Sequence, residues 1–141
     1  MNTICYINSL AWSDWLLDSI SVNEDEERIE IKLVHYSDGM CVPDASATIF
    51  CDKFIGFALA GLHTAMNVDY LRINETGDLI TESLQLIKNN YGELPSAFPF
   101  PFLWSCGEIK TLDSTWYQLD LKLIDGSIMK IACGGFNLEL L

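Results

Sequence analysis

The feature that most constrains the fold is a strict alternation of apolar and polar residues near the C-terminus. Residues 117–123 read Tyr-Gln-Leu-Asp-Leu-Lys-Leu, and period-two alternation is typical of a strand with one buried face. Asp125-Gly126 follows, and then residues 128–133 form a second apolar-rich run. A turn dipeptide between two strand-like segments predicts a β-hairpin.

The same alternation selects the length of the hairpin loop. A two-residue turn would set Leu121 opposite Lys130 and mix the two faces. A three-residue loop sets Leu121 opposite Met129, so that both side chains face the core. We therefore predict a three-residue loop over residues 124–126, with Gly126 in the left-handed conformation.

A second segment of the chain resembles this hairpin. Residues 29–33 (IEIKL) match residues 119–123 (LDLKL) in type, and an Asp-Gly follows each of them. An I-x-C-x-x-F pattern then occurs at residues 49–54 and again at residues 131–136. We predict two similar hairpins, with a chance match of common strand residues as the alternative. Whether the hairpins share one sheet or form two facing sheets stays open.

The remaining segments complete the prediction of an α+β fold, mainly antiparallel sheet with one main helix, in a single domain over residues 1–141. Apolar residues at helical spacing predict the helix at about residues 79–91, with Asp78 as N-cap and Gly92 after its end. Further expected strand or extended segments are residues 16–22, 54–62 (continuing the strand of Cys51), 69–73, 93–102 (three prolines and three phenylalanines) and 103–109.

Charge and targeting signals narrow the classes of partner. Eight Lys and Arg against 20 Asp and Glu give a net charge of −12. This charge excludes nucleic acid and anionic membranes as expected partners, because both bind Lys and Arg. The N-terminal residues do not resemble a signal peptide, and no apolar run approaches membrane-spanning length. We therefore expect a cytoplasmic protein whose five cysteines stay reduced. Cys51 and Cys133 lie inside apolar runs, and we expect them to be small buried hydrophobes.

No catalytic motif or zinc-ligand spacing occurs in the sequence, so we expect no enzyme activity, cofactor or metal. Cys51 and His63 are candidates for a nucleophile and base, but a reactive thiol needs an electropositive setting that this chain does not favour. His35 ends a strand-like run, and we expect it to form a local hydrogen bond there.

The candidate partner-binding residues are all carboxylates. Asp14 and Asp18 would share one face of a helix, although a solvated turn is the simpler interpretation. The acidic run comprises Glu24, Asp25, Glu26 and Glu27, and is either a solvated hairpin tip or a contact for a basic protein. Together with Glu30 and Asp120 on the strands, these carboxylates are predicted to form one acidic surface.

Three stretches also carry a resemblance. Residues 78–92 and 116–133 look like a group of small acidic bacterial proteins of unknown function. Residues 12–20 (WSDWLLDSI) resemble the start of immunity-type proteins of bacterial polymorphic toxin systems, with Ser13-Asp14 where a His-Asp pair is expected. The resemblance implies a non-catalytic protein that binds and inhibits a cognate toxin, and −12 would suit a basic toxin. The alternative is a small domain that self-associates or binds a small ligand between sheet and helix.

Overall fold

The computed structural model describes the chain except residues 1, 24, 38–40, 62–65 and 92–113. Two helices and eight strands form two antiparallel four-stranded sheets, which confirms the α+β prediction. The elements are α1 (Thr3–Ser9), β1 (Trp15–Asn23), β2 (Arg28–His35), β3 (Ala45–Asp52), β4 (Gly56–Ala60), β5 (Val68–Asn74), α2 (Asp78–Tyr91), β6 (Tyr117–Leu123), β7 (Ile128–Cys133) and β8 (Gly135–Leu140). The predicted segments 16–22 and 69–73 correspond to β1 and β5, whereas 93–102 and 103–109 lie outside the described residues.

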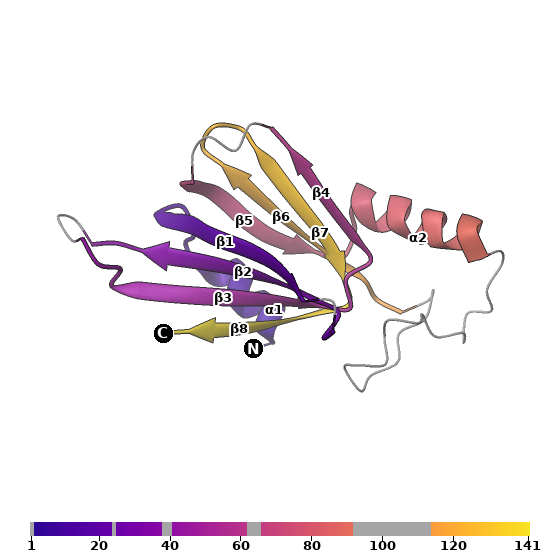
Figure 1. The fold of residues 1–141 in the computed structure, drawn as a ribbon, viewed down its shortest axis with the longest axis horizontal. Helices are drawn as coiled ribbons and strands as arrows, with labels where there is room; N and C mark the ends of the chain where they lie inside the picture. Colours follow the sequence, from indigo (N-terminus) through magenta and orange to yellow (C-terminus); the bar gives the residue numbers. More distant parts are fainter. Residues whose placement is uncertain (1, 24, 38–40, 62–65, 92–113) are drawn as a thin grey trace.

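The two sheets have matching connectivity. Their strand orders are β1-β2-β3-β8 and β4-β7-β6-β5, so the β2–β3 hairpin is central in one sheet and β6–β7 in the other. Each half of the chain forms a three-stranded meander and then sends its fourth strand to the edge of the other sheet. Figure 1 shows the two sheets spreading apart from the corner at which these strands cross. The two predicted hairpins therefore belong to two different sheets.

The register of the β6–β7 hairpin is the predicted one. Leu121 lies opposite Met129, and the Leu123 N–H donates to the Ser127 carbonyl at 2.9 Å. The three-residue loop contains Gly126 at φ 90°, a left-handed conformation that glycine adopts without strain. Leu121 and Met129 are each 1% exposed, because this register turns both side chains into the core.

The β2–β3 hairpin keeps the same faces with a different pairing. Ile29 lies opposite Cys51, whereas its counterpart Leu119 lies opposite Ile131, two positions before Cys133. A shift of two residues leaves the same side chains on the buried face, since strand side chains alternate with period two. The match between residues 29–33 and 119–123 therefore identifies strands that occupy the same place in the two sheets. These strands nevertheless pair with their hairpin partners in different registers.

The prediction that residues 54–62 continue the strand of Cys51 is wrong. Lys53 has φ 56°, which ends β3 and turns the chain into the other sheet. There the Ile55 N–H donates to the Ala132 carbonyl at 2.7 Å, and Gly134 N–H donates back to the Asp52 carbonyl at 2.9 Å. The chain therefore changes sheets at a corner that both halves share.

The core lies between the sheets and includes side chains from both. Its largest fully buried members are Ile7, Ile29, Ile31, Leu33, Ile49, Leu119, Leu121, Leu123, Met129 and Ile131. Ile7 belongs to α1, a helix that the sequence analysis did not predict, which packs against β5 and β8. The Asn8 side chain accepts from the Ile73 N–H at 2.8 Å and donates to the Ile73 carbonyl at 2.9 Å. These two hydrogen bonds satisfy the outward N–H and C=O groups of Ile73 at the edge of β5, as a neighbouring strand would.

Candidate functional site

The predicted carboxylates Asp14 and Asp18 are both exposed and both belong to the region of β1. Asp14 lies in the turn before β1, and Asp18 lies in the bulge between Leu17 and Ser19 of that strand. The turn that we favoured for Asp14 is therefore present, but the segment is a strand and forms no shared helical face.

The acidic run forms the turn between β1 and β2. Asp25 and Glu26 are exposed, Glu27 is partly buried with φ 54°, and Glu24 lies outside the described residues. Glu26 forms an ion pair with Arg28 at 3.2 Å. The predicted carboxylates thus lie before, within and after a single edge strand, whose nine residues span about 30 Å at roughly 3.3 Å each.

Arg28 joins this turn to the corner between the sheets. Its Nε lies 2.8 Å from Asp52 Oδ1, and its guanidinium lies 4.9 Å from the centre of the Phe50 ring. Asn137 of β8 donates to the other Asp52 oxygen at 3.0 Å. Asp52 is only 7% exposed, so this carboxylate holds strands together and is not displayed to a partner.

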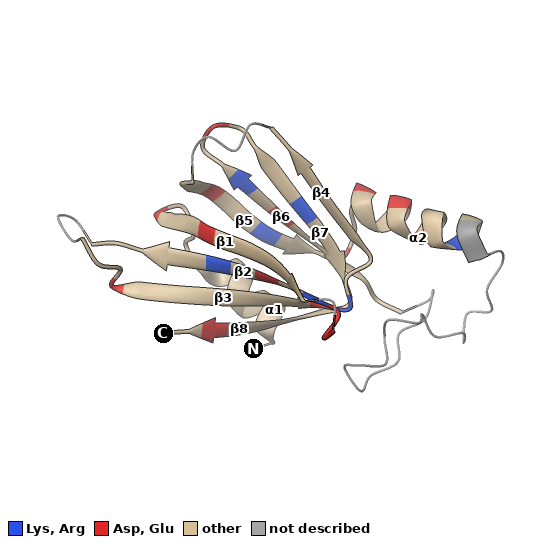
Figure 2. Cartoon of the chain, in the orientation of Figure 1, with Lys and Arg blue, Asp and Glu red and all other residues tan. Residues whose placement is uncertain are grey.

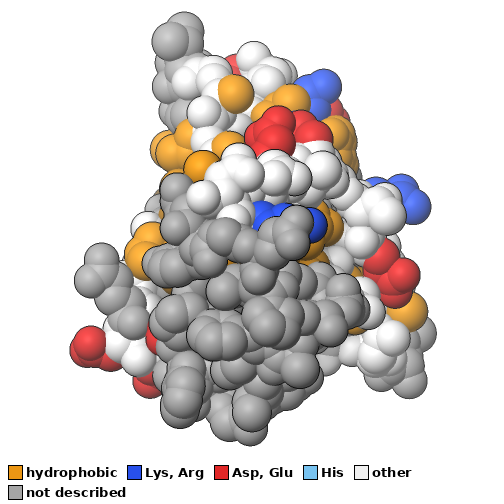
Figure 3. Space-filling view, turned by 90° about the vertical axis from the view of Figure 1, so that its right-hand side faces the viewer, with side chains coloured by type: hydrophobic (Ala, Val, Ile, Leu, Met, Phe, Trp, Pro, Cys, Tyr) orange, Lys and Arg blue, Asp and Glu red, His pale blue; other side chains and the backbone are white. Residues whose placement is uncertain are grey.

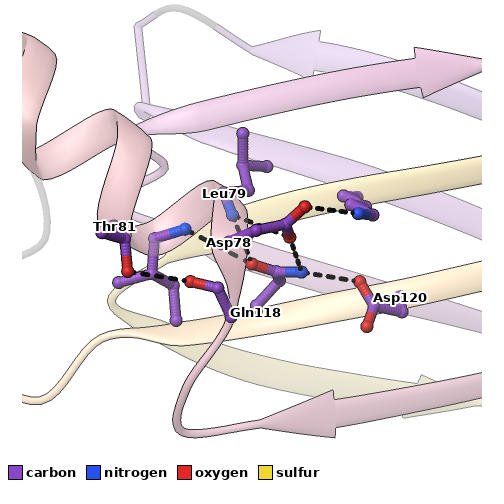
Figure 4. A network of polar contacts seen from close by, with 8 residues as sticks. Asp78, Leu79, Thr81, Gln118 and Asp120 are labelled. Carbon is purple, nitrogen blue, oxygen red and sulfur yellow. Dashed lines mark hydrogen bonds and ion pairs between the residues drawn. The ribbon is translucent and has the colours of Figure 1, made fainter.

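A second polar cluster lies where the first turn of α2 meets the outer face of the sheet β4-β7-β6-β5 (Figure 4). Gln118 of β6 is 3% exposed, and its side-chain oxygen accepts from the N–H groups of Leu79 at 2.9 Å and Ile80 at 3.3 Å. Its side-chain nitrogen donates to Asp78 at 3.1 Å and to Asp120 at 2.9 Å. Gln118 therefore supplies the acceptor that a helix N-terminus needs and fixes α2 to the sheet.

The predicted N-cap Asp78 has a wider role in this cluster. Its Oδ1 accepts from the Leu79 N–H at 2.9 Å, and its Oδ2 lies 2.8 Å from Lys130 Nζ. The hydrogen bonds from Lys130 and then Gln118 lower the pKa of Asp78 to about 2. Asp78, Asp120 and Glu82 in turn raise the pKa of Lys130. Three carboxylates thus act on one ammonium group, and Arg72 of β5 lies opposite one of them, Asp120.

A hollow of about 180 Å³ lies beside this cluster. Its walls come from β4, the start of α2 and β7, and comprise Ala58, Leu59, Ala60, Asp78, Leu79, Glu82, Ile128 and Lys130. It combines an apolar wall from β4 with carboxylates from α2. Glu82, Gln118 and Lys130 carry no signal of this site in the sequence, because their proximity depends on how α2 lies on the sheet.

The expected local hydrogen bond of His35 is present. His35 Nδ1 lies 2.7 Å from Asp44 Oδ1, and the Ser37 hydroxyl donates to the other Asp44 oxygen. The hydrogen bonds from Ser37 and then His35 lower the pKa of the Asp44 carboxyl. In a catalytic triad the imidazole lies between serine and carboxylate, whereas here the carboxylate lies between the other two. This arrangement stabilises the connection between β2 and β3.

Cys51 and Cys133 are fully buried, as the sequence analysis expected. Burial, followed by a hydrogen bond with Cys133, raises the pKa of the Cys51 thiol well above its ordinary value. Such a thiol is a poor nucleophile at neutral pH. His63, the base considered for it, lies outside the described residues.

The prediction of one acidic surface is wrong in its extent. Glu30 lies on the outward face of the first sheet, and Asp120 lies on the outward face of the second. In each strand the residues on both sides of the carboxylate are buried, so the alternation of the strand turns the carboxylate outward. Figure 2 shows carboxylates on both sheets, with Lys and Arg also present on β5, β6 and β7. Figure 3 shows both acidic and basic groups on the side that it views. The acidity is therefore spread over the molecule.

No protein-family model, curated protein or solved structure matches the chain. Within the part of the chain that the structure describes, no group of three or more His, Cys, Asp or Glu residues is arranged to hold a metal ion. None of the described helices has the length and apolar character needed to cross a membrane.

Proposed function

We propose that this chain is a non-catalytic binding protein that recognises a basic protein, and that it acts as an immunity-like inhibitor of a toxin. The observation that carries the proposal is the placement of exposed carboxylates on β1 and beside its two ends, at Asp14, Asp18, Asp25 and Glu26. The toxin as partner comes from the resemblance of residues 12–20 to immunity-type proteins.

The spacing of these carboxylates suits a role in attracting a partner. The Debye length is about 8 Å at physiological ionic strength, whereas the carboxylates are spread over a strand of about 30 Å. A partner close to the surface is therefore attracted mainly by the carboxylate nearest to it. At longer range and lower salt the carboxylates add to the field of a chain with net charge −12. Such fields accelerate association with a basic surface more than they slow its dissociation.

The test begins with affinity capture from the native host at low and moderate salt. We expect a basic protein that is retained at low salt and lost as salt rises. Producing that protein alone in a test host should arrest growth, and co-production of this chain should relieve the arrest. An acidic partner, binding indifferent to salt, or no relief of growth arrest would contradict the proposal.

Matched charge variants test the role of β1. Asp14→Lys with Asp18→Lys changes the net charge by the same amount as Glu75→Lys with Glu139→Lys, and all four positions are exposed. We expect the β1 pair to lower the association rate at low salt about tenfold, and the control pair to lower it much less. Equal effects would show that only the total charge matters.

The alternative, a small-ligand site between sheet and helix, is favoured by the hollow beside α2. Its volume of about 180 Å³ is below the roughly 300–1,000 Å³ typical of such sites. A second hollow, between α1 and β8, has a volume of about 320 Å³, at the lower end of that range. We prefer a protein partner because of the exposed carboxylates on and beside β1.

A further inference from the structure

The four sheet edges differ in how they are protected. An unprotected edge strand presents unpaired N–H and C=O groups to other chains, and bulges, charges or covering elements normally prevent such pairing. β1 has the bulge at Asp18 and a bridge from Leu16 to Asn67. β5 has its own bulge and the Asn8 amide, and β8 carries Glu139 and lies against α1.

Among the described residues, β4 has neither a bulge nor a charge, although α2 contacts it as α1 contacts β8. The sequence of β4, Gly-Phe-Ala-Leu-Ala, contains no charge and no proline, and its pairing with β7 has no bulge. Phe57 and Leu59 are 39% and 54% exposed. Among the described residues, β7 is the only strand that pairs with β4. β4 is therefore the edge best suited to accept another strand.

The alternation of hydrogen bonds shows which groups point outward from β4. Leu123 donates to Ser127, so alternate residues of β7 after Ser127, including Met129 and Ile131, bond to β6. The residues between them point towards β4, and the Ala132 carbonyl accepts from Ile55, the residue just before that strand. Phe57 and Leu59 lie opposite Ile131 and Met129. Their N–H and C=O groups consequently point away from the sheet.

The surroundings of β4 indicate the character of the added strand. Side chains of a new strand on the Phe57 and Leu59 side would meet apolar groups. Those on the Ala58 side would lie beside the hollow, which is lined by the carboxylates of Asp78 and Glu82 and by the single ammonium group of Lys130. The complementary segment alternates apolar and basic residues. A second copy of the chain is disfavoured because it also carries a net charge of −12.

We propose that the outer edge of β4 binds an extended, alternately apolar and basic segment of the partner protein, which extends the sheet β4-β7-β6-β5 by one strand. This inference rests on the proposed function for the presence of a protein partner. The main-chain bonds of Phe57 and Leu59 supply affinity, and the carboxylates beside the hollow supply the preference for basic side chains. The carboxylates of β1 then attract the partner without forming this contact.

A labelled ten-residue peptide of alternating valine and lysine is the probe, and a valine–glutamate peptide is its charge control. Binding to the full chain is measured by fluorescence anisotropy. We expect the lysine peptide alone to bind, and Glu82→Gln to weaken it. Leu59→Pro removes an outward N–H, whereas Leu59→Ala removes the side chain and keeps the N–H. Leu59→Pro should bind at least fivefold more weakly than Leu59→Ala.

Amide hydrogen exchange on the wild-type chain provides a test that does not depend on a folded proline variant. The bound peptide should slow exchange at Phe57 and Leu59. Protection elsewhere, or equal affinities of Leu59→Pro and Leu59→Ala, would overturn the inference. A dimer of the unliganded chain that Leu59→Pro dissociates would also overturn it, with a second copy as the occupant. If both Leu59 variants capture the native partner as wild type does, the inference fails while the proposed function stands.

Discussion

Replacing Gln118 by methionine tests how much the hydrogen bonds between the Gln118 side chain and the start of α2 stabilise the protein. Methionine keeps the length of the side chain but removes the acceptor that serves Leu79 and Ile80. The Leu79 N–H still has Asp78 as an acceptor, whereas the Ile80 N–H loses the one side-chain acceptor shown for it. A buried donor left without a partner costs about 1–3 kcal/mol. Asp78 and Asp120 are more exposed than the Ile80 N–H, so water can replace the hydrogen bond that each of them loses from the Gln118 side chain.

The free energy of unfolding should therefore fall by about 2 kcal/mol. For a chain of 141 residues this corresponds to a lower Tm by roughly 6–10 °C. Urea unfolding followed by circular dichroism measures the change, and an unchanged m-value shows that the unfolded state is comparable. Gln85→Met is the matched control, because its side chain is exposed and bonds only to Asn89 in the described structure. The reasoning is refuted if the two variants differ by less than about 0.5 kcal/mol.

Two further predictions concern a glycine and an ion pair. Gly126→Ala should lower the free energy of unfolding by about 1–2 kcal/mol, because its φ of 90° is strained for alanine. Gly135→Ala is the control, because no atom lies within 4 Å of the new Cβ. It should change the free energy of unfolding by under about 0.5 kcal/mol in the same urea assay. Equal losses would contradict this. The low pKa of Asp78 stabilises the fold above about pH 4, and this contribution disappears as pH falls towards 2. In Lys130→Met, NMR titration should show the pKa of Asp78 moving back towards 3.8; an unmoved pKa would exclude Lys130 as the main cause.

The parts of the fold that follow from local patterns were predictable. Leu121 and Met129 face each other because alternation and the Asp-Gly position allow only one register that buries both. The helix beginning near Asp78 was predictable because its cap and apolar spacing lie within one short segment. In both cases the deciding residues are close together in the sequence.

The parts that depend on distant contacts were not predictable. Lys53 adopts a positive φ at a residue type that does not signal a turn, so the change of sheet after β3 left no local sign. The first helix is only seven residues long, too short to be stable without packing of Ile7 in the core. Its cap, Asn2, was a usable signal, since its side chain accepts from the Cys5 N–H at 2.8 Å.

The candidate sites divide in the same way. The exposed carboxylates near β1 were found because exposure of a charge run is the usual outcome. Gln118 was missed because its contact with Leu79 joins residues 39 positions apart. The edge of β4 was missed because an apolar run resembles a buried strand until its neighbours are known.

The exchange of β4 and β8 between the sheets makes the two halves of the chain mutually dependent for folding. A fragment ending before β5 would leave β3 without β8, and β4 without β7. Neither half can then satisfy its backbone or bury its apolar face alone. Folding must wait until strands from both halves are available, which raises the separation in sequence between contacting residues and slows the search. Once formed, the interlocked sheets should unfold together in one cooperative transition, with no stable half-folded intermediate.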